Sequence, residues 1–308
     1  ESCFSGQLVQ SFSAMTTRIL SAALFLAASI PSLADQAALG QQLTKTYQAW
    51  RDAVVKRDAR QWQALTADYR RREVQNRLVS EKRAFPAAVF ELPAPPPSLQ
   101  GLRIMHLSQK GPTAKVGYFG AVNFGVGGAP TENVLVLSFV SERGRWTYDR
   151  ADFVNLAALP EVRKELAAGN PRYFKETPEC QATGQVPPTP ALVPPAKYIA
   201  KAYVFCPGRE VQLQINRVSR HRFANAKEAE IVLGGARDGR NEVTFTAKPL
   251  EGSTGKEAMA IRVYLMSEIE GVKPIIAYEY LVKEGQPVKG FESGQFNLDP
   301  ATAAKLLP

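Results

Sequence analysis

The feature that most constrains this chain is a proline-rich segment near its middle. Residues 177–195, TPECQATGQVPPTPALVPP, contain six prolines and few side chains able to pack a hydrophobic core. Proline has a fixed φ and no backbone N–H, so such a segment favours an extended conformation and avoids helices and sheet interiors. We therefore predict a semi-rigid linker at residues 176–195, with a folded domain on each side.

The size of the chain agrees with two domains. It has 308 residues, of which 45% are hydrophobic and 22% are charged, an ordinary composition for a folded protein. Because domains usually have about 100–150 residues, we assign residues 35–175 to a first domain and residues 196–308 to a second.

The first residues have the pattern of a secretory signal. From Met15 the chain reads MTTRILSAALFLAASIPSLA, in which one arginine precedes an apolar run that ends before Pro31. Small residues then occupy the positions that signal peptidase reads, and the run is shorter than the roughly 20 residues of a membrane span. We assign residues 1–34 to upstream residues and a signal, and predict a periplasmic or extracellular protein that begins at Asp35, without a transmembrane segment. The alternative is a retained N-terminal anchor helix.

Export changes the interpretation of the cysteines. Cys180 lies in the linker, and Cys206 ends the apolar stretch AYVFC 26 positions later. In an oxidising compartment such a pair predicts a disulfide, which would contribute about 3 kcal/mol by the loop-entropy relation. Two cysteines and two distant histidines make no metal-ligand pattern, so we expect neither a metal nor another cofactor.

Helical periodicity opens the first domain. Asp58, with Gln61 three residues later, predicts the N-cap of a second helix, and a third helical stretch ends before Pro86. The apolar residues that define the first helix by their three- and four-residue spacing are Leu39, Leu43, Tyr47, Trp50 and Val54.

Four β-strands and a closing helix follow. Alternation and turn residues predict strands at 102–108, 114–120, 133–140 and 145–149, and proline and glycine bracket a helix at 160–169. Three helices before an antiparallel meander indicate an α+β domain with its helices on one face of the sheet.

This order of elements resembles the nuclear-transport-factor-2-like cone fold, the family that includes ketosteroid isomerase. The similarity is carried by YQAWRDAVVKRDARQWQALTAD and by the hairpin VLVLSFVSERGRWTYDRADF, and it covers residues 39–156. The resemblance implies helices on a curved antiparallel sheet with a pocket between them. It also implies an aspartate base and an acidic hydrogen-bond donor, which no motif places in this chain.

A cone pocket has candidate residues. By alternation His106 shares a face with Leu102 and Ile104, which makes it a candidate acid–base group together with Asp149. The candidate lining residues are Trp50, Tyr118 and Trp146. For each the alternative is an ordinary core or half-buried position.

Positive charge is concentrated in the first domain. Residues 35–175 contain 21 Lys and Arg against 13 Asp and Glu, whereas residues 196–308 contain 16 against 13. Arg70, Arg71, Arg72 and Arg77 gather on the third helix, which predicts either an anion-binding surface or a solvated face.

After the linker the periodicity changes to two, which predicts an all-β domain. Val211, Leu213 and Ile215 alternate with Gln212 and Gln214, and turn residues separate about seven such strands, the signature of a β-sandwich.

The segment VQLQINRVSRHRFANAKEAEIVLGGARDGRNEVTFTA looks like the centre of a jelly-roll, galactose-binding-like accessory domain of glycan-active proteins. Arg217 stands where that pattern has a glycine. Around it Arg220, His221 and Arg222 form a basic excursion, which we interpret as a loop that either binds a carboxylate or phosphate or faces solvent.

The sequence thus predicts an α+β cone-like domain followed by an all-β sandwich. We expect an exported, non-catalytic binding protein of the cell envelope that recognises a partner protein or an anionic polymer, and no specific nucleic acid. The alternative is a small-molecule enzyme or carrier that uses the cone pocket, with His106 or Asp149 as its acid–base group.

Overall fold

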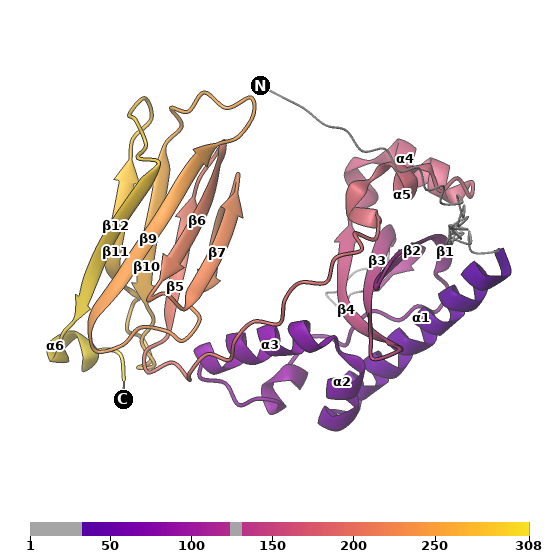
Figure 1. Ribbon diagram of the computed structural model, residues 1–308, viewed down its shortest axis with the longest axis horizontal. Coiled ribbons are helices and arrows are strands. Elements are labelled where there is room, and N and C mark those ends of the chain that lie inside the picture. The colour runs from indigo at the N-terminus through magenta and orange to yellow at the C-terminus, as the bar shows by residue number, and fades with distance from the viewer. Residues whose placement is uncertain (1–32, 124–130, 308) are drawn as a thin grey trace, which may run out of the picture.

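The computed structural model describes residues 33–123 and 131–307, which form two parts placed one beyond the other along the longest axis (Figure 1). We call residues 33–180 the N-terminal part and residues 198–307 the C-terminal part. The predicted secretory signal lies outside the described residues, except for its last two positions.

Three helices open the N-terminal part, as the apolar spacing predicts. The carboxylate of Asp58 accepts the backbone N–H of Gln61 at 3.0 Å, which confirms the predicted N-cap. The third helix ends at Ser80, because Lys82 has a φ of 57° and a left-handed residue does not continue an α-helix. The elements are α1 (Leu33–Val55), α2 (Ala59–Leu65), α3 (Asp68–Ser80) and the 3-10 turn η1 (Ala87–Phe90).

An antiparallel sheet in the order β1-β2-β3-β4 forms the centre of this part. Helix α1 packs on one face through Leu43 and Tyr47, and the closing helices pack on the other through Leu166 and Phe174. Helices therefore lie on both faces of the sheet, whereas the sequence predicted one. The elements are β1 (Arg103–Lys110), β2 (Thr113–Val122), β3 (Thr131–Glu142), β4 (Arg145–Val154), η2 (Leu156–Ala158), α4 (Pro160–Ala167), α5 (Arg172–Glu176) and η3 (Pro178–Cys180).

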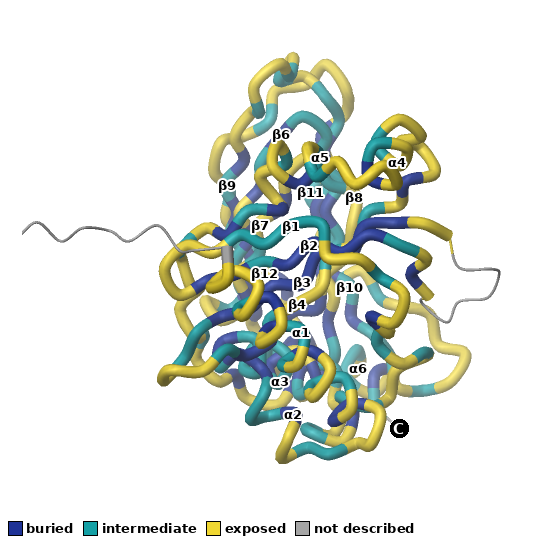
Figure 2. The backbone as a smooth tube through the Cα atoms, turned by 90° about the vertical axis from the view of Figure 1, so that its right-hand side faces the viewer, coloured by how far each residue is buried: buried dark blue, intermediate teal, exposed yellow. Residues whose placement is uncertain are grey.

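Two four-stranded antiparallel sheets make up the C-terminal part, in the orders β11-β10-β5-β8 and β12-β9-β6-β7. Their inner faces share one core, to which Val204 and Leu213 contribute from opposite sheets. Successive residues of a strand point to opposite faces, so buried and exposed positions alternate along the chain (Figure 2). The strands are β5 (Ala200–Phe205), β6 (Arg209–Ile215), β7 (Ser219–Ala224), β8 (Lys227–Ile231), β9 (Gly239–Pro249), β10 (Met259–Leu265), β11 (Ile275–Val282) and β12 (Phe291–Leu298), followed by helix α6 (Pro300–Ala303).

Strand β7 corrects one prediction. The composition around Arg220 and Arg222 predicts a loop, but this segment pairs with β6 over its whole length and buries Phe223 in the core. Pairing with a neighbouring strand decides the conformation here, and local composition does not record that pairing. The C-terminal part therefore has eight strands rather than about seven.

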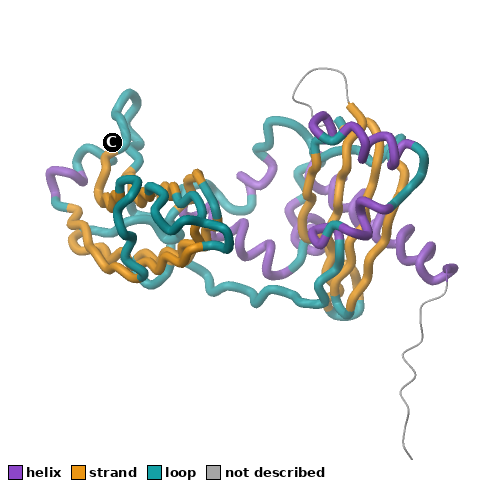
Figure 3. The backbone as a smooth tube through the Cα atoms, turned by 90° about the horizontal axis from the view of Figure 1, so that it is seen from above, coloured by secondary structure: helices purple, strands orange, loops and turns teal. Residues whose placement is uncertain are grey.

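Residues 181–197 connect the two parts as a long loop (Figure 3). The loop is fastened to the N-terminal part at several points. Ser108 Oγ accepts the N–H of Ala182 at 2.9 Å, and the side chain of Asn76 bonds the carbonyl of Ala191 at 2.8 Å and the N–H of Val193 at 3.1 Å. Residues 181–195 of the predicted linker thus form no helix or strand, as expected, but they are anchored along their course, and the first predicted linker residues belong instead to α5 and η3 of the N-terminal part.

Candidate functional site

The outer face of the sheet β12-β9-β6-β7 carries two rows of polar side chains. In the first row Arg222, Gln212, Thr246 and Phe291 are successive cross-strand neighbours. They alternate with core residues along their strands, so their side chains point away from the core. With strands about 4.8 Å apart, the row is about 14 Å long.

The second row runs beside the first, two residues further along each strand. It consists of Arg220, Gln214, Thr244 and Ser293. Two residues of a strand span about 7 Å, so the rows lie close enough for one ligand to contact both. In both rows a guanidinium is followed by an amide and a hydroxyl.

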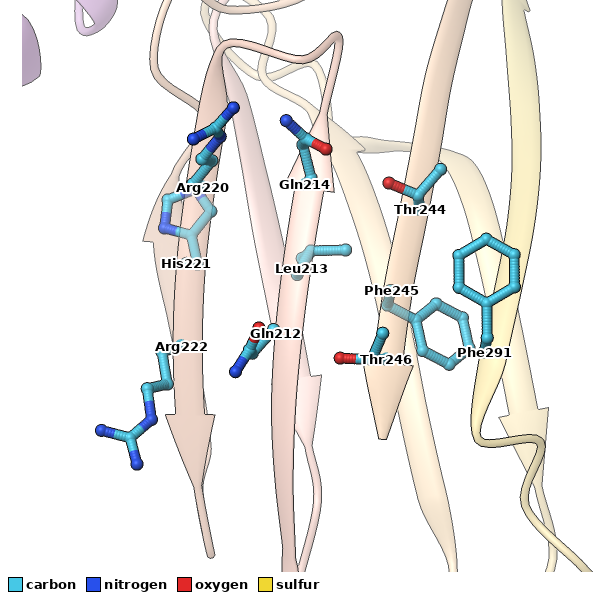
Figure 4. A pocket seen from close by; sticks show the side chains of 10 residues that line it. All are labelled: Gln212, Leu213, Gln214, Arg220, His221, Arg222, Thr244, Phe245, Thr246 and Phe291. Carbon is cyan, nitrogen blue, oxygen red and sulfur yellow. The ribbon is translucent and has the colours of Figure 1, made fainter. Parts of the chain in front are cut away.

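This face is hollowed into a groove of about 530 Å³. That volume is within the range of about 300–1,000 Å³ that is usual for small-ligand sites. Figure 4 shows Arg220 and Gln214 near one end of the groove, and the ring of Phe291 on its far side. The lining residues include two arginines and no carboxylate.

The two arginines differ in their ion pairing. Arg222 Nη2 donates to Oε2 of Glu210 at 2.5 Å, so a carboxylate already compensates its charge. No carboxylate of the described residues forms such a pair with Arg220, which is exposed. Its guanidinium offers a planar set of N–H donors to a carboxylate, sulfate or phosphate.

Phe291 provides an apolar surface on the far side of the groove. Its side chain is 63% exposed, the largest exposure among the large hydrophobic residues of the described chain. An exposed aromatic ring beside polar groups is typical of a surface that binds a ligand with both apolar and polar faces.

His221 lies behind this face and supports it. Its ring is stacked on Phe223, and its Nε2 lies 2.6 Å from Ser219 Oγ, which also accepts the N–H of Leu233 at 2.8 Å. Burial lowers the pKa of His221 to about 4, so the ring is neutral at neutral pH. Because Ser219 is fully buried, this pair positions β7 and does not present a nucleophile to a ligand.

The predicted anion-binding face on α3 is largely neutralised by ion pairs. Of its four arginines, Arg72 alone forms no ion pair with a described residue. The pairs are Arg70 with Glu73 and Asp149, Arg71 with Asp68, and Arg77 with Glu81. The helix is therefore a weaker anion site than its composition indicates.

The predicted position of His106 is wrong. A bulge between Ile104 and His106 shifts the register of β1 against β2. His106 consequently stacks on Phe174 and contacts Gln181 at 3.4 Å, on the face covered by α4 and α5. Burial lowers the pKa of His106.

The other residues predicted for a cone pocket are not brought together with His106. Trp50 packs on Tyr148, with ring centroids 4.1 Å apart, and Trp146 and Tyr118 belong to the same core, on the α1 face. Asp149 accepts a hydrogen bond from Arg70 Nε at 2.9 Å. The candidate acid–base groups thus lie on different faces and do not converge on one site.

The predicted disulfide is not present: both thiols are free and buried. Cys180 belongs to the core between the N-terminal sheet and helices α4 and α5, whereas Cys206 belongs to the core of the C-terminal part. Spacing along the chain predicted the pair, but each thiol packs in the core of its own part.

The sequence did not identify several of the groove residues as ligand-binding residues. Gln212 and Gln214 were visible in the sequence as the polar half of an alternating strand, and Thr244 and Thr246 occupy the same kind of position in β9, but the alternation does not show which strands are neighbours. Nothing in the sequence marked Phe291 as a binding residue. It is the first residue of a strand and follows Gly290, so no alternating pattern precedes it.

No group of three or more potential metal ligands is found among the described residues. None of the helices described combines the length and apolar content that crossing a bilayer requires. Comparison of the chain with protein-family models, curated proteins and solved structures finds no match.

Proposed function

We propose that this protein is a non-catalytic binding protein that holds a linear acidic polysaccharide on the outer face of the sheet β12-β9-β6-β7. The observation that carries the proposal is the pattern of the two rows, in which guanidinium, amide and hydroxyl groups succeed one another across the strands and an aromatic ring, that of Phe291, ends the first row.

Each group in the rows matches a part of such a ligand. The guanidinium of Arg220 suits a carboxylate, because two parallel N–H donors meet two oxygens. The amides of Gln212 and Gln214 can donate to and accept from sugar hydroxyls. The ring of Phe291 can pack against the apolar face of a sugar ring.

The proposal extends to the fold. The arrangement of two four-stranded sheets around one core supports a jelly-roll-like sandwich for the C-terminal part. Helix α1 across an antiparallel meander supports a variant of the nuclear-transport-factor-2-like cone for the N-terminal part, with added helices on its second face. The two parts correspond to the domains at 35–175 and 196–308.

The proposal also concerns location. We propose that the protein is exported and acts in the periplasm or outside the cell, on the basis of the signal pattern that begins at Met15. Polysaccharides that carry carboxylates occur in the same compartments, so the location and the ligand class agree.

Isothermal titration with oligogalacturonate and alginate oligomers tests this function, with neutral cello-oligosaccharides as the comparison. We expect the acidic oligomers to bind in low salt and to bind more weakly as salt rises. Arg220→Gln and Phe291→Ala should each weaken binding about fivefold or more, the equivalent of about 1 kcal/mol.

Arg262→Gln is the matched control. Arg262 lies on the other sheet and pairs with Glu279 at 2.6 Å, outside the lining of this groove. It should bind like the wild type. Equal binding of neutral and acidic oligomers, or no effect of Arg220→Gln, would contradict the proposal.

A further inference from the structure

We infer that the bound chain does not end at strand β7 but continues over it into a second groove, between the C-terminal part, the linker and helix α3. This inference rests on the proposed function and names a longer ligand for it. The second groove has a volume of about 670 Å³.

Three segments that are distant in the sequence line the second groove. Asn76 and Arg77 belong to α3, Leu192 belongs to the linker, and Arg217 and Val218 belong to the turn between β6 and β7. The site is therefore complete only when both parts of the protein and the linker are in place.

The two grooves adjoin at strand β7. Arg220 and His221 line both grooves: the first groove lies on the outer face of the sheet, and the second lies at the junction with α3 and the linker. Arg220, which has no ion pair with a described residue, thus lies where a chain would cross the edge of the sheet. A ligand held by Arg220 in the first groove has its next unit at the second.

The charges of the second groove suit an acidic chain. The lining has three guanidinium groups, of Arg77, Arg217 and Arg220, and the first two are 70% and 84% exposed. Arg77 also pairs with Glu81 at 3.1 Å and Arg217 with Glu242 at 3.5 Å, so both are partly compensated. Two carboxylates, of Glu73 and Glu230, also line it, and Glu73 is already bound by Arg70 at 2.7 Å. The three arginines exceed the two carboxylates of the lining by one, and Arg220 is the guanidinium among them that has no ion pair with a described residue.

The backbone of Arg217 is strained. Its φ is 59°, and that of Asn216 is 51°, so both turn residues are left-handed. Tight hairpin turns of this kind favour Asn-Gly, because glycine adopts a positive φ without a steric cost. An arginine therefore occupies a position where glycine fits better, as Arg57 and Arg143 also do, so this strain bears on stability rather than on the ligand.

Apolar surface accompanies the charges, as it does in the first groove. Leu192 is 55% exposed and Val218 is 44% exposed, and both line the second groove. They correspond to Phe291 on the far side of the first groove, so that each groove combines guanidinium groups with an apolar contact.

Hydrogen bonds hold the walls of the second groove in place. Asn76 bonds the linker backbone on both sides of Leu192, at Ala191 and Val193. Ser80 of α3 accepts the N–H of Gly234, next to Leu233 of the lining. The groove is thus formed before a ligand arrives, which limits the entropy that binding costs.

Oligogalacturonates of defined length, from the dimer to the dodecamer, provide the test. We expect the affinity of the wild type to keep rising beyond the length that fills the first groove. Arg217→Gly and Arg77→Gln should each weaken binding of the dodecamer by about twofold to fivefold, the range for one exposed charge pair, and leave binding of the shortest bound oligomer unchanged.

The controls separate this inference from the proposed function. Arg262→Gln should behave like the wild type at every length, and circular dichroism checks that each variant is folded. If the affinity stops rising once the first groove is filled, or if the variants affect short and long oligomers equally, the second groove is not part of the site and the proposed function stands. If no oligomer binds, both fail.

Discussion

Ser80 of helix α3 and Gly234 of the C-terminal part are joined directly, since Ser80 Oγ accepts the backbone N–H of Gly234 at 2.8 Å. Ser80 is fully buried, and its hydroxyl donates to the carbonyl of Asn76 at 2.6 Å. Near it Lys82 pairs with Glu268 at 2.5 Å. Helix α3 and the residues just after it thus contact the C-terminal part directly.

Ser80→Ala should loosen this junction. The substitution removes the partner of the Gly234 N–H, and because Gly234 is only partly buried we expect a loss of about 0.5–1.5 kcal/mol. We expect the linker at 181–197 to be cleaved faster by subtilisin, as followed by gel electrophoresis.

Ser138→Ala is the control, because its buried hydroxyl has no hydrogen-bond partner among the described residues. It should leave the cleavage rate unchanged. Equal rates for the wild type and Ser80→Ala would show that this hydrogen bond does not hold the two parts together.

Arg70→Gln and Arg77→Gln should differ, although both lie on α3. Arg70 pairs with Asp149, whose side chain is only 9% exposed, so its removal leaves a nearly buried carboxylate unpaired. We expect a loss of about 1–3 kcal/mol in the free energy of unfolding. Arg77 is 70% exposed, and its replacement should cost no more than about 0.5 kcal/mol. Urea denaturation measures both, and equal effects would contradict the assigned roles.

Arg217→Gly should stabilise the protein even as it weakens binding of long oligomers. Glycine relieves the left-handed strain at φ 59°, worth about 1 kcal/mol. Arg240→Gly, within strand β9, should instead destabilise by about 0.5–1 kcal/mol, since glycine gains no such relief in a strand. Thermal denaturation of the two variants checks the opposite signs.

His221 should make the stability of the C-terminal part depend on pH. Its pKa is about 4 in the folded protein, below the ordinary value of 6.5, so the unfolded chain takes up the proton first as the pH falls. Protonation of His221 in the unfolded chain therefore does not lower the free energy of unfolding above pH 6.5. As the pH falls from 6.5 toward 4, it lowers this free energy by up to about 3 kcal/mol. Urea denaturation between pH 7 and 4 should show a shallower loss for His221→Gln than for the wild type. Parallel curves would contradict this prediction.

Both cysteines should behave as buried thiols. Burial raises the pKa of Cys180 and of Cys206, which disfavours the reactive thiolate. We expect both to resist alkylation in the folded protein and to react after unfolding without a reductant. An intact mass two hydrogens below that of the dithiol would show instead that they are bonded.

Part of the candidate site could be predicted from the sequence. Arg220 and Arg222 were named as anion-binding residues from composition alone, but they were expected in a loop. Gln214 and Thr244 were recognised as the polar half of alternating strands. That these residues form rows depends on the order β12-β9-β6-β7, and the order of strands is decided by contacts between segments far apart in the chain.

The sequence by itself determined the features that depend on neighbours along the chain: the helices with their 3.6-residue spacing, the N-cap at Asp58, the alternating strands and the extended linker. The tertiary structure alone decided the rest. It placed helices on both faces of the first sheet, turned His106 to the second face through a bulge, and separated Cys180 from Cys206. It also paired residues 219–224, which were predicted as a loop, with β6, so that they form the edge strand β7. The reason is that periodicity records which face of an element is apolar, whereas the partner that covers this face is selected by packing and pairing across the whole chain.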